Sequence, residues 1–346
     1  MIFNKNNNLI KDILIVDGQP GCGKTMFNRI FNSFHNIEIY KYSSELENMC
    51  SFYRHKKITF DAAKFFIETY ADENLYSQMM GRNTNFRYSD LSSVFQSSKK
   101  ILYLSRLFKK GDENIPSIIN KKKPILHFAT HNIISNSAIL FETFPNKIKF
   151  INIVRHPVYM VHQQAINHIE FEKNSARQLI QTMKYKNIEI PALWHNEPEK
   201  YISIKNPYEK AIHQMHILEK LNKISEKKII KNYKKRFLKI SFDDFVLNPN
   251  IFIKKIENFL KVKFDKEVYK TMEKEKIPRK KLINGRHTSI YEKYGWKRGN
   301  PKFTEREEID NKIKNLELNN VSKYYLSKLK KMSYEYENQY LKNVLY

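Results

Sequence analysis

The residues best suited to chemistry form a glycine-rich stretch near the start of the chain. Residues 18–25 read Gly-Gln-Pro-Gly-Cys-Gly-Lys-Thr and match the phosphate-binding pattern GxxxxGK(S/T). An apolar run at residues 13–16 precedes them and apolar residues at helical spacing follow, which predicts a turn between a buried strand and a helix. Glycines let a backbone approach phosphate closely, and the N–H groups of a first helical turn point toward it. We therefore expect a phosphate site here, with Lys24 adding positive charge.

Two more candidate residues follow predicted strands. Residues 124–131 read as a strand that ends at a polar tip containing His131, and residues 149–154 read as a buried strand that ends at Arg155. Strands that alternate with helices favour an α/β fold with a central parallel sheet flanked by helices. Ligands bind such sheets at the carboxyl ends of the strands, just where Lys24 and Arg155 lie.

The length and composition favour one domain. The chain has 346 residues, 41% of them hydrophobic, and it shows no internal repeat or clear linker. We expect a single domain over residues 1–346, with residues 303–346 as a charged helical C-terminal extension. The apolar spacing of that extension suits either a docked helix pair or a dimer contact, and the oligomeric state stays open.

The charge favours anionic partners. The chain carries 62 Lys and Arg against 36 Asp and Glu, a formal charge of +26, although a lysine-rich surface that serves only solubility explains this equally well. Cys22 and Cys50 form neither a disulfide framework nor a metal-binding spacing. No apolar run reaches transmembrane length. These features predict a cytoplasmic protein without a membrane span or a metal site.

Four segments, in this order along the chain, resemble sulfotransferases that use 3′-phosphoadenosine 5′-phosphosulfate (PAPS). Residues 18–26 are similar to the family's 5′-phosphosulfate loop, and residues 124–131 to the segment in which many members place a Thr-His catalytic base. Residues 151–157 resemble the 3′-phosphate motif, an apolar strand that ends in Arg-x-Pro. Residues 240–249 resemble a segment made of a strand, an acidic pair and a helix. The resemblance covers about residues 10–300.

The resemblance implies a P-loop sulfotransferase fold, PAPS as donor, adenosine 3′,5′-bisphosphate as product and no metal. It implies that His131 is the general base. Members with a catalytic lysine place it where Gly21 falls in this chain, and we expect Lys24 to supply the equivalent charge from a neighbouring position and to neutralise the leaving phosphate. The implied donor-binding residues are Gln19, Pro20, Gly21, Cys22, Gly23, Lys24, Thr25, Met26, Arg155 and Gln163. The chain departs from the family at Lys24, where members usually carry Ser or Thr, and at Gln163, where they often carry Ser. Residues 294–298 loosely resemble a basic segment that closes over the nucleotide, although Trp296 suits packing better.

These features predict transfer of a sulfuryl group from PAPS to a hydroxyl or, as a second choice, an amine. The acceptor is not identified by the sequence; a carbohydrate is one candidate, and nucleic acid is not expected as a partner. The main alternative is a P-loop kinase that uses Mg-ATP, because Lys24 and Thr25 complete the pattern such enzymes need. A basic nucleic-acid-binding protein without catalysis ranks third, since only the charge supports it.

Overall fold

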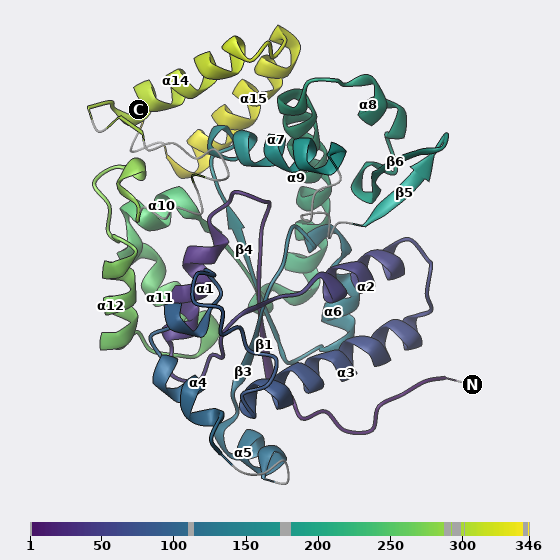
Figure 1. Ribbon diagram of the computed structural model, residues 1–346, viewed down its shortest axis with the longest axis vertical. Coiled ribbons are helices and arrows are strands. Elements are labelled where there is room, and N and C mark those ends of the chain that lie inside the picture. The colour runs from purple at the N-terminus through teal and green to yellow at the C-terminus, as the bar shows by residue number, and fades with distance from the viewer. Residues whose placement is uncertain are drawn as a thin grey trace.

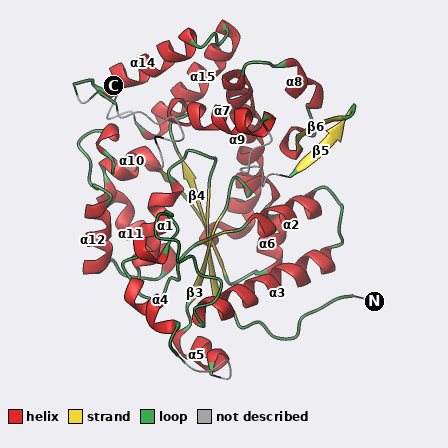
Figure 2. Ribbon diagram, in the orientation of Figure 1, coloured by secondary structure: helices red, strands yellow, loops and turns green. Residues whose placement is uncertain are grey.

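The computed structural model describes residues 2–109, 114–173, 181–286, 292, 299–300, 302–341 and 345. At its centre lies a parallel sheet of five strands in the order β2-β3-β1-β4-β7, with helices on both faces (Figures 1 and 2). This confirms the predicted α/β class with a central parallel sheet. The strands of the sheet are β1 (Asp12–Asp17), β2 (Lys41–Tyr42), β3 (Ile125–Ala129), β4 (Ile148–Val154) and β7 (Phe237–Ser241).

The central strand β1 shows why the sheet is buried on both faces. Its apolar residues alternate between two core clusters: Leu14 and Val16 belong to one cluster, and Ile13 and Ile15 to the other. A strand covered on both faces needs an unbroken apolar run instead of an alternation of apolar and polar residues. The phosphate-loop pattern begins directly after this strand, at the carboxyl edge of the sheet.

Two groups of helices cover the two faces. The larger core cluster joins one side of the sheet to α1 (Lys24–Ser33), α7 (Val158–Glu172), α10 (Phe242–Leu247), α11 (Pro249–Leu260), α12 (Lys266–Lys274), α14 (Glu305–Leu318) and α15 (Lys323–Tyr340). The second cluster joins the other side to α2 (Ser44–Arg54), α3 (Phe60–Met79), α5 (Ile115–Lys122) and α6 (Ala138–Thr143). The long helix α9 (Pro207–Tyr233) contributes to both clusters. The remaining short helices are α4 (Lys100–Arg106) and α8 (Pro198–Ser203).

The C-terminal stretch is a docked helix pair. Buried residues of α14 and α15, among them Ile309 and Leu329, belong to the larger core cluster. Helix α14 begins with a capping box between Thr304 and Glu307, which explains its sharp start. None of the helices in the described part of the chain is both long and apolar enough to span a bilayer.

One sequence-based expectation for local structure is wrong. The composition of residues 37–40 predicts the second strand there, but the strand is Lys41–Tyr42, and Ile37 makes only an isolated bridge to Ile125. The spacing of apolar residues predicts that residues 178–235 are mainly helical; their described part is, and it also contains an antiparallel hairpin of β5 (Thr182–Tyr185) and β6 (Ile188–Pro191). The two-residue turn at 186–187 has positive φ at both positions, the geometry that hairpin turns favour.

Candidate functional site

The loop between β1 and α1 has room for no side chain at Gly18 or Gly23. Gly23 has φ 88°, and a Cβ added there would lie 2.4 Å from the ring of Phe242. A Cβ at Gly18 would lie 2.4 Å from the carbonyl oxygen of Ile153. Side chains at these positions would therefore collide with strand β4 or with the start of α10, so the predicted glycine turn has the compact form that phosphate binding needs.

Helix α1 begins directly after this loop and has no side-chain cap. The Met26 N–H donates a hydrogen bond to the Gly23 carbonyl at 3.1 Å, and the start of the helix before it is the positive end, to which an anion is attracted. Lys24 is only 5% exposed, and its ammonium donates a hydrogen bond to the carbonyl of Gly18 at 3.1 Å. The lysine thus folds back over the loop and carries its charge to the place where a phosphate would lie.

Arg155 lies beside the same loop. It follows β4, and its Nη1 donates a hydrogen bond to the carbonyl of Gly21 at 2.9 Å. The guanidinium lies over the ring of Phe242 at 4.4 Å and near that of Tyr159 at 5.3 Å. Within the described part of the chain its Nε makes no hydrogen bond, and the carboxylate of Asp243 is 3.9 Å away. Arg155 is therefore held in place with Nε turned toward the buried Asp243, and the residue lines the cavity where its guanidinium could meet an anion.

Helix α15 contacts the residues that lie next to Arg155. Asp243 is fully buried and accepts hydrogen bonds from the backbone N–H of His156 and from the hydroxyl of Tyr336, each at 2.7 Å. Burial and the neighbouring Asp243 raise the pKa of Tyr336, so its hydroxyl stays protonated and donates. His156 Nε2 in turn lies 3.0 Å from Glu337. Helix α15 therefore contributes to the setting of an arginine that is far away in sequence.

His131 extends from the end of β3 into the same cavity and is held by Glu47 of α2. The Glu47 Oε1 accepts the backbone N–H of His131 at 2.7 Å and lies 3.0 Å from its Nδ1. Because a carboxylate only accepts, Nδ1 carries the proton, which leaves Nε2 able to take one. The imidazole is 44% exposed and stacks on Tyr42 at 5.3 Å. The Tyr42 hydroxyl lies 2.8 Å from Thr25 Oγ1, which links the base candidate to the phosphate loop.

A single cavity of about 760 Å³ brings most of the predicted residues together. The predicted residues that line it are Pro20, Gly21, Gly23, Lys24, Thr25, Met26, His131, Arg155 and Gln163. Among the described residues the lining does not include Gln19 or Cys22. The Gln19 side chain instead accepts a hydrogen bond from Gln164 at 3.2 Å, and burial raises the pKa of the Cys22 thiol. Residues 294–298 lie outside the described residues.

Further cavity residues were missed at the sequence level. Arg29 and Arg286 both contact Glu275, at 2.8 Å and 3.2 Å, and Arg279 approaches Met26 Sδ at 3.6 Å. All these groups line the cavity, which makes the side next to α1 strongly basic. A basic run at residues 279–287 was the signal in the sequence, but nothing there linked it to α1. No pattern in the sequence indicated that Tyr42 or Glu47 belongs to the site.

Asp17 and Asp243, the carboxylates closest in sequence to the loop and to Arg155, are hydrogen-bonded within the protein. Asp17, at the end of β1, accepts hydrogen bonds from Thr130 at 2.9 Å and from the backbone N–H groups of Ile133 and Ile134. Burial raises the pKa of Asp17. Neither Asp17 nor Asp243 is among the described residues that line the cavity, and no cluster of three metal-binding side chains occurs in the described residues.

No protein-family model and no curated sequence matches the chain. One similar solved structure is the sulfotransferase domain from the Synechococcus PCC 7002 olefin synthase, with 14% identity, 92% of this chain and 98% of that chain covered, and a TM-score of 0.37. A second is the sulfotransferase domain from the curacin biosynthetic pathway, with 13% identity, coverages of 89% and 98%, and a TM-score of 0.40. A third is sulfotransferase STF9 from Mycobacterium avium, with 10% identity, coverages of 90% and 76%, and a TM-score of 0.39.

These three structures come from the family that the sequence motifs resemble. Their TM-scores of 0.37 to 0.40 are too low for the likeness to support an activity. The function is therefore argued from the residues of the cavity.

Proposed function

We propose that this protein is a sulfotransferase that transfers a sulfuryl group from PAPS to an acceptor hydroxyl. The observation that carries the proposal is the position of Arg155 at the rim of the phosphate loop, 2.9 Å from the carbonyl of Gly21. The loop and Arg155 form two adjoining anion sites, which suits a nucleotide with phosphate groups at both its 3′ and 5′ positions. A guanidinium fork is well matched to a phosphate, and an ATP molecule lacks the 3′-phosphate that it would bind.

Each residue then has a distinct role. The bound donor supplies the sulfuryl group, whose bond to the 5′-phosphate breaks as its bond to the acceptor oxygen forms. Lys24 and the N–H groups of the first turn of α1 neutralise charge on the leaving phosphate. His131 Nε2 accepts the proton of the acceptor hydroxyl, and Glu47 keeps the proton on Nδ1 so that Nε2 stays free for this task.

Two observations favour PAPS over Mg-ATP. The carboxylates closest in sequence to the loop and to Arg155, Asp17 and Asp243, are hydrogen-bonded within the protein and do not line the described cavity. Of the carboxylates that line the described cavity, Glu275 is paired with Arg29 and Glu47 accepts hydrogen bonds from His131, while Glu170 belongs to α7. A kinase would need a carboxylate that faces Thr25 and can hold magnesium, directly or through water.

The test is calorimetric titration with adenosine 3′,5′-bisphosphate and with ATP, each with and without Mg²⁺. We expect metal-independent binding of the bisphosphate, weakened at least about tenfold in Arg155→Ala and restored only in part in Arg155→Lys. Arg87→Ala is the control, since that side chain is 78% exposed and does not line the described cavity. Preference for Mg-ATP, with Arg155→Ala binding as the wild type does, would refute the proposal in favour of the kinase.

The acceptor is proposed only by class. A hydroxyl compound is the first choice and an amine the second, with carbohydrates as the first group to screen. Support comes from the polar residues that line the cavity beyond the loop, among them Asn167, Asn315 and Asn319. Amide side chains donate and accept hydrogen bonds, as recognition of neighbouring hydroxyls requires. The cytoplasmic location stays a prediction from the sequence.

A further inference from the structure

Helix α4 and the turns that follow it as far as Lys109 present large apolar side chains to solvent. Ile101 is 76% exposed and Phe108 is 86% exposed, and Leu107 beside them is 47% exposed. Ile101 and Phe108 are seven residues apart, and the backbone stays in turns as far as Lys109, so both side chains lie on one side of this segment. Apolar groups exposed together in this way mark an interaction site more often than singly scattered ones do.

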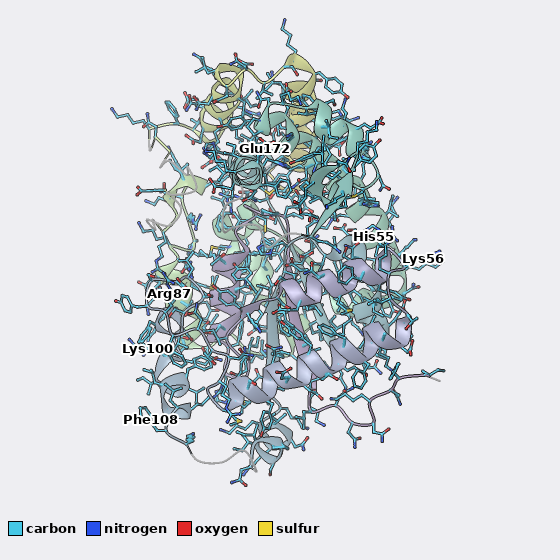
Figure 3. The ribbon with its side chains drawn as sticks, turned by 45° about the vertical axis from the view of Figure 1, so that its right-hand side comes forward. His55, Lys56, Arg87, Lys100, Phe108 and Glu172 are labelled. Carbon is cyan, nitrogen blue, oxygen red and sulfur yellow. The ribbon has the colours of Figure 1, made fainter. Side chains whose placement is uncertain are left out.

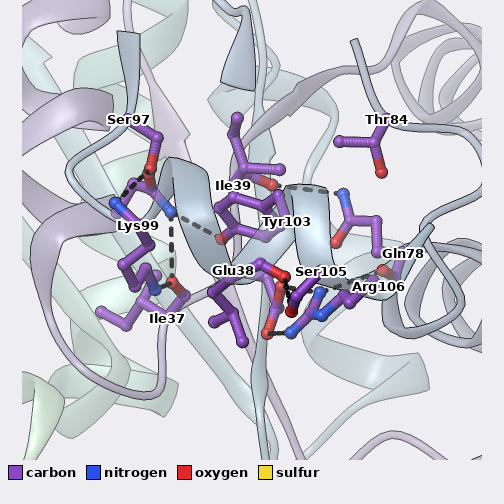
Figure 4. A network of polar contacts seen from close by, with 12 residues as sticks. Ile37, Glu38, Ile39, Gln78, Thr84, Ser97, Lys99, Tyr103, Ser105 and Arg106 are labelled. Atoms are coloured by element: carbon purple, nitrogen blue, oxygen red, sulfur yellow. Dashed lines mark hydrogen bonds and ion pairs between the residues drawn. The ribbon is translucent and has the colours of Figure 1, made fainter. Parts of the chain in front are cut away.

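The opposite side of α4 is fastened into the protein (Figure 4). The Arg106 guanidinium forms two hydrogen bonds with the Glu38 carboxylate, at 2.7 Å and 2.9 Å, and another with the carbonyl of Gln78. Tyr103 is 1% exposed and accepts a hydrogen bond from Asn32 at 3.0 Å. The helix cannot turn its apolar side inward without breaking this network, so the exposed side chains are a fixed feature of the surface.

Exposed lysines adjoin the apolar side chains. Residues 99–123 contain eight Lys and Arg but only two Asp and Glu, and of these cations Arg106 is paired with Glu38 and Lys99 is bonded to the carbonyl of Phe34. Lys100 and Lys109 flank the apolar side chains and are exposed, as are the three consecutive lysines 121–123 at the end of α5. Figure 3 shows Arg87, Lys100 and Phe108 along the same edge of the molecule. Apolar side chains framed by lysines match a surface that is apolar just beneath a layer of negative charge.

We propose that α4 and its flanking lysines bind the surface of a membrane that contains anionic lipids. Ile101 and Phe108 enter the boundary between headgroups and acyl chains, while the lysines contact the lipid phosphates. A bilayer fits better than a protein partner, because the apolar side chains are few and project far into solvent, and exposed lysines stand directly before and after them.

This surface lies away from the candidate active site. Lys99, at the start of α4, donates a hydrogen bond to the carbonyl of Phe34 at 3.0 Å, at the far end of the helix that begins with the phosphate loop. Since α1 has 10 residues, that end is about 15 Å from the loop. A protein docked through α4 therefore keeps the cavity open to water-soluble ligands, and the inference does not depend on the proposed function.

The test is flotation with vesicles of phosphatidylcholine alone and of phosphatidylcholine mixed with phosphatidylglycerol. We expect binding to the mixed vesicles only, weakened by added salt, and reduced at least about tenfold in the double variant Ile101→Ser, Phe108→Ser. The matched control is Leu318→Ser with Tyr334→Ser, which removes side chains that are 73% and 60% exposed on α14 and α15. Both double variants should unfold thermally near the wild-type temperature, which shows that each is folded.

Three results would overturn the proposal. The first is that the wild-type protein does not float with the mixed vesicles, and the second is that the α4 variant floats as well as the wild type does. The third is that the control variant loses as much binding as the α4 variant. If the wild-type protein ignores vesicles but self-associates in solution, and the α4 variant does not, the surface is a protein contact instead.

Discussion

Replacing Gly23 with alanine tests whether the phosphate loop and Arg155 form one unit. Gly23 has φ 88°, where an alanine costs about 1–2 kcal/mol of backbone strain. Its Cβ would also lie 2.4 Å from the Phe242 ring, which supports the Arg155 guanidinium at 4.4 Å. The ring must move, and the Arg155 guanidinium then loses the ring on which it lies. A charge-assisted hydrogen bond contributes about 1.5–3 kcal/mol, so we expect the affinity for adenosine 3′,5′-bisphosphate to fall by roughly ten- to a hundredfold.

The matched control is Gly81→Ala. Gly81 has a similar φ of 79°, but a Cβ there would meet the side chain of Leu107 at 3.2 Å, away from the cavity. Both variants should lose similar stability from backbone strain in thermal unfolding, and only Gly23→Ala should lose nucleotide binding in calorimetry. Wild-type affinity in Gly23→Ala, or an equal loss in Gly81→Ala, would refute the reasoning. If Gly23→Ala does not fold, Phe242→Leu provides a second test and should weaken binding several-fold.

Three further expectations concern the base, a buried ion pair and acid. Glu47→Gln should lower kcat in a sulfuryl-transfer assay at least about tenfold with little change in nucleotide affinity, because it disturbs only the orientation of His131. An equal loss of kcat and of nucleotide affinity would contradict this. Glu38→Gln should lower the free energy of unfolding in urea by about 3–5 kcal/mol, since it leaves a buried guanidinium uncompensated. Burial lowers the pKa values of His127 and His168 from 6.5 to about 3. The unfolded chain therefore binds their protons first, and stability should fall as pH drops below about 6.5, by about 2 kcal/mol for each histidine at pH 5; a flat profile between pH 7 and 5 would count against it.

The main elements of the fold could be predicted because their signals are local. The run at residues 13–16 is apolar at every position, and its two faces indeed belong to different core clusters. The misplaced second strand shows the limit. Residues 37–40 have the composition of a strand, but the Glu38 side chain is bound to Arg106, 68 residues later. A pairing at that distance leaves no trace in the local pattern.

The same contrast holds for the candidate site. His131 and Arg155 could be predicted because each follows a strand of a parallel sheet, and such strands end at one edge. Glu47 could not, because it lies inside an ordinary amphipathic helix and meets His131 across 84 residues. The assignment of Cys22 and Gln19 to the donor site came from their place in the loop pattern. The fold turns their side chains away from the described cavity, although their backbones still help to shape the loop.

Helix α15 makes the surroundings of Arg155 depend on a segment that is synthesised late. Tyr336 and Glu337 bind Asp243 and His156, the groups next to Arg155. A fragment that stops before α15 keeps the loop, Lys24 and Arg155, yet it exposes the apolar surface that α15 covers and leaves Asp243 without the Tyr336 hydroxyl. During synthesis, the surroundings of Arg155 are therefore complete only after Tyr336 and Glu337 have emerged and α15 has docked. A prematurely released fragment would contain every residue of the phosphate loop and still lack the finished setting of Arg155.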